Sequence, residues 1–325
     1  WHSYHNRNFH FNKEYGSEEW ATPGSLKRIR NKDDRKNRIL SKNVSVSVEG
    51  VLSNNNMFII GSSGSYKTNA VVTPNLLKAA NHYIVLDVKG ELQYKFGNYL
   101  QEKGYTIRSL NLKNPEKSDR YNPFLYIEKE EDLIRLITNL HEAVKKPDAM
   151  QGEPFWDDGV DLYLQAIFYY EWLEAMEESR VGSMNNILYL VNLETQKMPD
   201  GETTRLQLEM DKLAKRKGDF YPPVRDYRKL KEGATETVRS IIIMVNAMLK
   251  LCETAGVKRI FEGDDIQIRE LGTGVGGTAE HPTDCKIALF LVLPDNDRSY
   301  NFLISIFYTQ AFDILMRMAD NEYHG

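Results

Sequence analysis

The chain has 325 residues, 41% of them hydrophobic and 27% charged, which is typical of a folded globular protein and excludes a disordered or fibrous one. Forty-two Lys and Arg against 46 Asp and Glu give a formal net charge of −4, which excludes a uniformly basic, histone-like protein but not a local basic face. The length indicates about two domains. The two cysteines, Cys252 and Cys285, lie far apart, so neither a disulfide framework nor a zinc site is expected.

The first part of the chain, residues 1–43, is polar and rich in basic residues between Lys27 and Arg38. We interpret it as a solvated basic arm; the alternative is an arm that contacts anionic lipid or nucleic acid. The longest apolar run, Ile287 to Leu293, is far shorter than the roughly 20 residues of a transmembrane helix, so no span is predicted. The chain begins at Trp1 rather than Met, and we therefore expect a piece of a longer protein.

Strand patterns dominate the region that follows the arm. Val44 to Val48 alternates apolar and polar residues, and Met57 to Ile60 is a short apolar run that predicts a buried strand before a glycine-rich loop. A helix is expected at 92–103, because Gly104 is a favourable residue just beyond a helix end. Strands alternating with helices at this spacing predict an α/β fold with a mainly parallel sheet. The predicted strands are residues 44–48, 57–60, 83–88 and 106–112.

Helical periodicity then replaces the strand signals over residues 128–233, which we interpret as an all-α insertion. Ser183 is the expected N-cap of its third helix, and Pro222, Pro223 and Gly233 are interpreted as turn residues. Beyond the insertion the α/β pattern resumes. Within and after the insertion, helices are predicted at 133–144, 160–168, 184–197, 202–217, 235–254 and 299–319, and a buried strand at 287–293.

The segment Gly61 to Thr68 carries the clearest chemical motif. It approximates the phosphate-binding pattern GxxxxGK[ST], in which glycines let backbone N–H groups face phosphate oxygens and the lysine reaches the β- and γ-phosphates. The hydroxyl of Thr68 is the expected Mg²⁺ ligand, and the following helix N-terminus adds its dipole. We therefore predict an ATP and Mg²⁺ site formed by Gly61, Ser62, Ser63, Gly64, Ser65, Tyr66, Lys67 and Thr68.

One residue of this motif departs from the pattern. Tyr66 stands where the pattern has glycine, and its ring could either crowd the phosphates or point outward. The alternative to a nucleotide site is a Ser/Gly turn followed by an incidental Lys-Thr pair.

Three further segments could contribute to a site. Asp87 ends a predicted strand, where it could either join the metal shell or cap the next helix. The charged segment Pro294 to Arg298 follows another strand and should lie at the same sheet edge. The run Gly272 to Gly277 formally matches GxGxxG, but it precedes a strand instead of linking a strand to a helix, so we interpret it as a flexible loop.

Five segments together make the chain resemble the type IV secretion system coupling proteins, the conjugal-transfer, DNA-pumping ATPases. The resemblance covers most of the chain and is most specific in a Tyr-Asn-Pro-Phe segment followed later by Pro-Asp-x-Asp-Arg. The segments are MFIIGSSGSYKT with TPNLL, LDVKGEL, GYTIRSLNLKNPEKSDRYNPF, GEPFWDDG and LFLVLPDNDRSYNFLISIFYTQAFD.

This resemblance implies a RecA-like P-loop NTPase domain interrupted by an all-α domain, and thus a basic arm at 1–43, a discontinuous nucleotide-binding domain at 44–127 and 234–325, and an all-α domain at 128–233. It implies a homo-hexamer at the cytoplasmic face of a bacterial inner or plasma membrane, held by an N-terminal anchor that would precede Trp1. Its implied partners are a relaxase with single-stranded DNA and the secretion channel.

The resemblance also places the family's Walker B strand, which ends in Asp-Glu, beyond Gly325. We therefore assign no catalytic residue here and expect the parent protein to hydrolyse ATP, while this chain by itself hydrolyses it poorly or not at all. Two alternatives are a catalytically silent docking module that recruits secretion substrates through the all-α domain, and a metabolic P-loop kinase. The second is disfavoured because the insertion has no place in a compact kinase. The basic stretches Lys27 to Arg38 and Lys212 to Arg228 are candidate DNA contacts, with a solvated face as the alternative for each.

Overall fold

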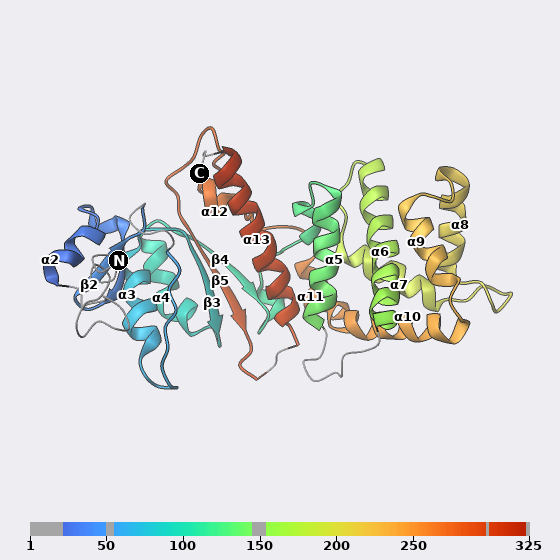
Figure 1. Cartoon of the computed structure of the whole chain (residues 1–325), viewed down its shortest axis with the longest axis horizontal. Helices are drawn as coiled ribbons and strands as arrows, with labels where there is room; N and C mark the ends of the chain where they lie inside the picture. Colours follow the sequence, from blue (N-terminus) through green and yellow to red (C-terminus); the bar gives the residue numbers. More distant parts are fainter. Residues whose placement is uncertain (1–21, 50–54, 145–153, 297–298, 323–325) are drawn as a thin grey trace, which may run out of the picture. The chain divides into compact units, whose positions relative to one another are not determined.

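The computed structural model describes residues 22–49, 55–144, 154–296 and 299–322, and the chain divides into two compact units, residues 1–81 and 82–325 (Figure 1). In the first unit, α2 (Pro23–Leu26) precedes an antiparallel hairpin of β1 (Asn37–Ser41) and β2 (Val44–Ser47). The strand predicted at 44–48 is confirmed, and Val46 lies on its buried side.

Much of the charge in the basic arm is paired within the first unit. Arg30 contacts Asp34 at 2.8 Å, Lys36 contacts Glu49 at 2.8 Å, and Lys78 reaches Asp34 at 3.4 Å. Part of the predicted arm is therefore folded chain with internal ion pairs; residues 1–21 of it lie outside the described residues.

A helical run that follows the glycine-rich loop is joined to the hairpin by one side chain. The run consists of a π-helical turn, Thr68–Val72, and α3 (Thr73–Lys78). The amide of Asn75 in α3 accepts from the Ile39 N–H at 2.9 Å and donates to the Ile39 carbonyl at 2.8 Å. This two-point contact satisfies both backbone groups of Ile39 as a neighbouring strand would.

The buried strand predicted at Met57 to Ile60 is wrong. These residues form no helix or strand, and Phe58 and Ile60 are 89% and 84% exposed. Composition favours a strand here, but a strand also needs a neighbour for its backbone groups, and within the described residues this segment has none.

The second unit is built on a three-stranded parallel sheet in the order β3-β5-β4. The strands are β3 (Tyr83–Val88), β4 (Thr106–Asn111) and β5 (Ile287–Leu293), which confirms three of the predicted strands. The central strand β5 is buried at every position because it has a strand on each side and covered faces. The predicted helix between β3 and β4 is α4 (Glu91–Glu102), and Gly104 beyond it has a φ of 86°.

Helix α13 (Asn301–Glu322) follows β5 and shares its apolar core, since Phe302, Ile306 and Phe307 cluster with alternate residues of β5. Figure 1 shows it beside the sheet and roughly in line with β5. Among the described residues, α13 alone has the length and apolar composition to cross a membrane; polar residues interrupt its apolar ones, so it contains no long unbroken apolar run. A core helix meets the same criterion, and the buried face of α13 is core.

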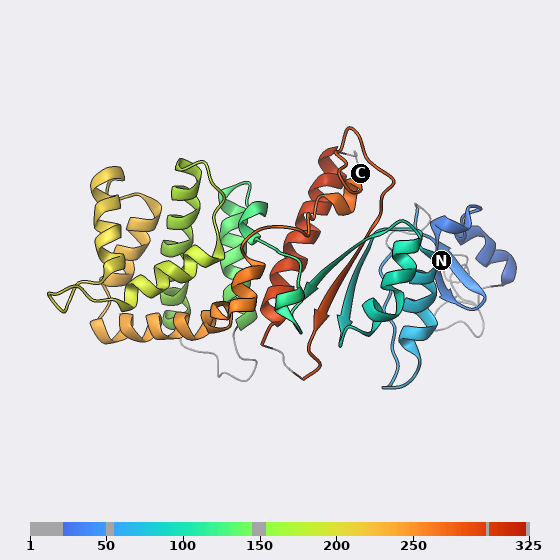
Figure 2. The same cartoon turned by 180° about the vertical axis from the view of Figure 1, so that it is seen from behind.

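In the described part of the chain between β4 and β5, helices predominate over residues 130–260, as predicted for 128–233, whereas residues 274–286 form no helix or strand. In Figures 1 and 2, helices α5, α6, α9 and α8 stand side by side with α10 across one end. Helix α9 was not predicted, because its two prolines were interpreted as breakers although proline is favourable in a first helical turn. The helices are α5 (Glu130–Val144), α6 (Pro154–Glu177), α7 (Met184–Thr195), α8 (Arg205–Lys217), α9 (Pro222–Lys231), α10 (Thr235–Leu249), α11 (Ala255–Ile260) and α12 (Glu270–Thr273).

A buried carboxylate organises the turn between α6 and α7. Glu171, 2% exposed, accepts from Arg180 at 2.6 Å, from the Ser183 N–H at 2.9 Å and from the Asn186 amide at 3.0 Å. Ser183 is the N-cap of α7, as predicted, because its hydroxyl accepts from the Asn185 N–H. The hydrogen bonds that Arg180 donates to Glu171 raise the pKa of Arg180.

The Tyr-Asn-Pro-Phe segment packs between the sheet and the helices. Tyr121 is fully buried, with its ring edge-on to Phe307 of α13 at 5.5 Å, and Phe124 stacks on Phe168 of α6 at 5.7 Å. Asn122 donates to the Gly182 carbonyl at 2.8 Å. The segment therefore contributes to the packing of the core.

Candidate functional site

The loop Gly61 to Thr68 is exposed and turns tightly on itself. The Ser65 N–H donates to the Ser62 carbonyl at 3.2 Å, and Gly64 adopts a φ of 77°, a left-handed conformation that glycine accepts without strain. A Cβ on Gly61 would clash with the Ser65 hydroxyl and press on the Lys67 side chain. Gly64 is therefore favoured by the backbone of the turn, and Gly61 leaves room for the side chains of Ser65 and Lys67, whatever the loop binds.

The ammonium group of Lys67 is folded back over its own loop. It donates to the carbonyls of Gly61 at 2.6 Å and Ser62 at 2.7 Å, and lies 3.4 Å from the Ser65 hydroxyl. Its charge is met only by neutral oxygens within the described residues. An anion in the loop would offer this ammonium a charged acceptor, which makes a shorter and stronger hydrogen bond.

Tyr66 has the backbone conformation that explains why the pattern favours glycine at its position. Its φ is 60°, in the left-handed region, which costs a residue with a side chain about 1–2 kcal/mol. The ring is 74% exposed. Of the two alternatives for this side chain, the structure shows the outward one.

Thr68 lies in the first turn of the helical run that begins at Lys67. The N–H groups of such a turn have no partner within the helix and carry its positive dipole end. The loop thus combines a lysine, hydroxyl side chains and a helix N-terminus, and these donors fit a phosphate group and its metal ion.

Asp87 is the penultimate residue of β3 and is 2% exposed. Its two oxygens accept from the N–H groups of Leu92 at 3.1 Å and Gln93 at 2.8 Å. The helix-cap alternative for Asp87 is therefore confirmed, because these are first-turn amides of α4. Its role as a metal ligand stays a prediction.

Two lysines that sequence reasoning missed lie at the carboxyl edge of the sheet. Lys89 has a φ of 83°, and its ammonium contacts the Asp295 carboxylate at 3.1 Å. The hydrogen bond to Asp295 raises the pKa of Lys89. The ammonium of Lys113 donates to the Lys89 carbonyl at 2.9 Å. A cavity of about 580 Å³ opens beside them, lined also by Glu91, Pro294 and Asn296. The expected position of the Pro294 segment at this edge is confirmed up to Asn296; Arg298 lies outside the described residues.

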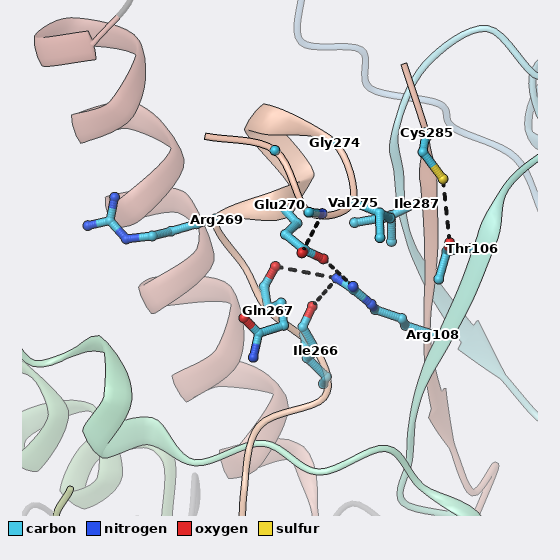
Figure 3. Close-up of polar contacts among 12 residues, drawn as sticks. Thr106, Arg108, Ile266, Gln267, Arg269, Glu270, Gly274, Val275, Cys285 and Ile287 are labelled. Carbon is cyan, nitrogen blue, oxygen red and sulfur yellow. Dashed lines mark hydrogen bonds and ion pairs between the residues drawn. The ribbon is translucent and has the colours of Figure 1, made fainter. Parts of the chain in front are cut away.

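The run Gly272 to Gly277 begins in the last residues of α12 and continues as a loop from Gly274, and this loop is held by hydrogen bonds instead of being flexible as expected. The Val275 N–H donates to the Cys285 carbonyl at 3.0 Å, and a Cβ on Gly274, whose φ is 79°, would clash with Thr283. Figure 3 shows how Arg108 of β4 and Glu270 of α12 hold this loop.

In that contact, Arg108 binds the Glu270 carboxylate and the Ile266 carbonyl, and Glu270 accepts from the Gly276 N–H at 2.7 Å. The Cys285 sulfur lies 3.7 Å from the Thr106 hydroxyl beside it. The sequence offered no signal for the Arg108 pair, because its partners are about 160 positions away.

Comparisons with known proteins agree with this architecture. A solved bacterial conjugative coupling protein, TrwBdeltaN70 in its unbound monoclinic form, has the same fold with a TM-score of 0.54 at 14% identity, over 90% of this chain and 58% of that one. A trigonal form of that protein with sulphate matches at a TM-score of 0.48 and 14% identity, over 79% and 51% of the two chains. No curated protein matches.

The first likeness confirms the expected fold class, a RecA-like α/β domain with a helical insertion. The chain spans less than two thirds of that solved protein. The family described as "Type IV secretory system Conjugative DNA transfer" matches residues 19–325, nearly the whole sequence. The chain therefore belongs to this family of conjugative DNA-transfer proteins of type IV secretion systems.

Proposed function

We propose that the chain is the nucleotide-binding part of a coupling ATPase, and that it binds ATP with Mg²⁺ through the loop Gly61 to Thr68. The observation that carries the proposal is the position of Lys67, whose ammonium lies over the loop and, among the described residues, is held by neutral oxygens and no carboxylate. A triphosphate would replace these weak acceptors with charged ones.

In this proposal each part of the loop has one task. Lys67 binds the β- and γ-phosphates, Thr68 offers its hydroxyl to Mg²⁺, and the backbone from Ser62 to Ser65 surrounds the phosphate oxygens. Bound ATP supplies a phosphoanhydride whose hydrolysis can drive movement between neighbouring subunits. We assign no residue of this chain to the hydrolytic step itself.

A nucleotide titration tests the proposal. Calorimetry with ATP is expected to show binding that Mg²⁺ strengthens, because the metal joins the Thr68 hydroxyl to the phosphates. The second candidate function is a docking module that recruits secretion substrates through the helices between β4 and β5. Flat ATP traces together with retained partner binding would favour that module and contradict the nucleotide site.

The partners of the whole protein are part of the same proposal. We infer a relaxase carrying single-stranded DNA, the channel proteins, a homo-hexamer and a membrane anchor from the family to which the chain belongs. The basic stretch at 212–228 is a weaker DNA candidate than its composition indicated, because Arg216 and Lys217 pair with carboxylates of α6 and Arg228 pairs with Asp219 at 2.6 Å. DNA binding through any such stretch should weaken steeply with salt.

Replacing Tyr66 separates backbone strain from ring crowding. Tyr66→Gly should raise the free energy of unfolding by about 1 kcal/mol, because glycine adopts a φ of 60° without the penalty that a side chain incurs. Tyr66→Ala removes the ring but keeps the strain, so its stability should stay within about 0.5 kcal/mol of the parent chain. Because the strain is present in the loop without ligand, neither variant should change ATP affinity by more than about twofold. Urea unfolding and calorimetry on the three proteins decide; tighter ATP binding by both variants would show that the ring hinders the phosphates.

A further inference from the structure

A second cavity lies on the helical part of the second unit, between α7, α8 and the turn that joins them. Its volume is about 680 Å³, within the usual range for ligand sites. Its apolar wall consists of Tyr189 and Leu193 from α7, Met198 and Pro199 from the turn, and Leu208 from α8. We call this cavity the α7–α8 groove.

The wall formed by the turn is rigidly built. Lys197 and Thr204 form an antiparallel bridge, the Met198 N–H donates to the Thr203 carbonyl at 2.8 Å, and Gly201 closes the reversal with a φ of 75°. The Thr204 hydroxyl donates to the buried Glu194 at 3.1 Å, which fixes the turn to α7. The groove is therefore formed before anything binds, which lowers the entropic cost of binding.

Two of the three charged side chains that line the groove, Lys197 and Arg205, are positive, and the third, Glu209, is matched by Lys212 at 2.8 Å. Asp200 of the turn is not part of the lining; hydrogen bonds from Thr203 and Glu202 lower its pKa, so it keeps a negative charge that also acts on Lys197. Lys197 donates only to the Gly201 carbonyl at 2.9 Å, and neither it nor Arg205 forms an ion pair with another described residue.

The apolar wall and these two cations together define the partner. We propose that the α7–α8 groove binds an acidic peptide segment that inserts apolar side chains beside Tyr189 and Leu193 and places carboxylates against Lys197 and Arg205. Tyr189 is 60% exposed and would form the aromatic anchor of such an interface. The assignment rests on the proposed function, since it makes this groove the place where the helical part receives a secretion substrate.

Nucleic acid fits the groove less well than an acidic peptide does. A DNA site neutralises several phosphates with a continuous row of cations, whereas this groove has two unpaired cations, a carboxylate at its rim and an aliphatic wall. Apolar anchors with a polar rim are instead the arrangement of protein–protein interfaces.

The test uses the whole chain and three fluorescein-labelled synthetic peptides of equal length. The first alternates Glu with Leu and Phe, the second replaces each Glu by Lys, and the third replaces each Leu and Phe by Ser. Fluorescence anisotropy should show binding of the first peptide only. Absence of binding by the folded chain, or equal binding of the third peptide, would overturn the proposal.

Charge reversal supplies the decisive comparison. Lys197→Glu combined with Arg205→Glu should weaken the acidic peptide by about tenfold or more and should create binding of the Lys peptide. Lys215→Glu, an exposed position on the same helix outside the groove, is the matched control and should change neither affinity. An acidic peptide whose affinity is unchanged by the double reversal would contradict the proposal.

A labelled oligothymidylate of similar charge tests whether the groove binds nucleic acid instead of a peptide. Tight binding of this oligonucleotide that the double reversal abolishes would replace the peptide assignment by a nucleic-acid one. An ATP titration on the same samples tests the nucleotide site independently of the groove. Loss of peptide binding with ATP binding retained contradicts only the groove, whereas flat ATP traces with retained peptide binding contradict only the nucleotide site.

Discussion

Replacing Lys67 by alanine should weaken ATP binding by about 10- to 100-fold, because a charge-assisted hydrogen bond to phosphate contributes roughly 1.5–3 kcal/mol. The variant should fold normally. The carbonyls of Gly61 and Ser62, which Lys67 covers in the absence of ligand, lie in an exposed loop where water can replace the ammonium. Isothermal calorimetry with Mg²⁺ and ATP measures the change.

Lys42→Ala is the matched control for this experiment. Lys42 lies in the exposed β1–β2 turn of the same unit, so the substitution removes the same charge from the same unit without touching the loop. ATP affinity should be unchanged in this variant. If Lys67→Ala bound ATP as tightly as Lys42→Ala does, the loop Gly61 to Thr68 would not be the phosphate site.

Removing the carboxylate of Glu171 should lower the free energy of unfolding by about 2–3 kcal/mol. Glu171→Ala would leave the Ser183 N–H and the Asn186 amide without this acceptor, and would leave Arg180 with its contact to the exposed Glu178. Urea unfolding, followed by circular dichroism of the helices, measures the loss.

The control for Glu171→Ala is a substitution at Glu178, a second carboxylate that binds the same arginine. Glu178 also accepts from Arg180, at 2.5 Å, but its side chain is 60% exposed. Glu178→Ala should therefore cost less than about 1 kcal/mol. Equal effects of the two substitutions would mean that the buried hydrogen bonds of Glu171 do not hold the turn between α6 and α7.

The elements that the sequence predicted well are those with strong local patterns. The strand at 287–293 is a continuous run of branched and aromatic residues, and Ser183 directly precedes an apolar helix. Such patterns need no knowledge of distant contacts. The domain boundaries remain a prediction, since α10 begins just beyond residue 233 and packs its buried face into the core shared with α6.

The sequence failed where the outcome depends on distant partners. Met57 to Ile60 has the composition of a strand, but composition does not say whether a neighbouring strand is available. For the same reason the pairing of Arg108 with Glu270 could not be predicted from the sequence. The phosphate loop was recognisable because its residues are contiguous, whereas the α7–α8 groove combines two helices and a turn whose mutual packing no local pattern specifies.

The double contact between Asn75 and Ile39 has a mechanical consequence. Because one amide fills both backbone positions of Ile39, α3 cannot slide or rotate against the hairpin without breaking two hydrogen bonds at once. A movement of the helix that begins at Lys67 would therefore move β1 as well. A conformational change in the loop Gly61 to Thr68 would thus displace the hairpin, although the hairpin forms no part of that loop.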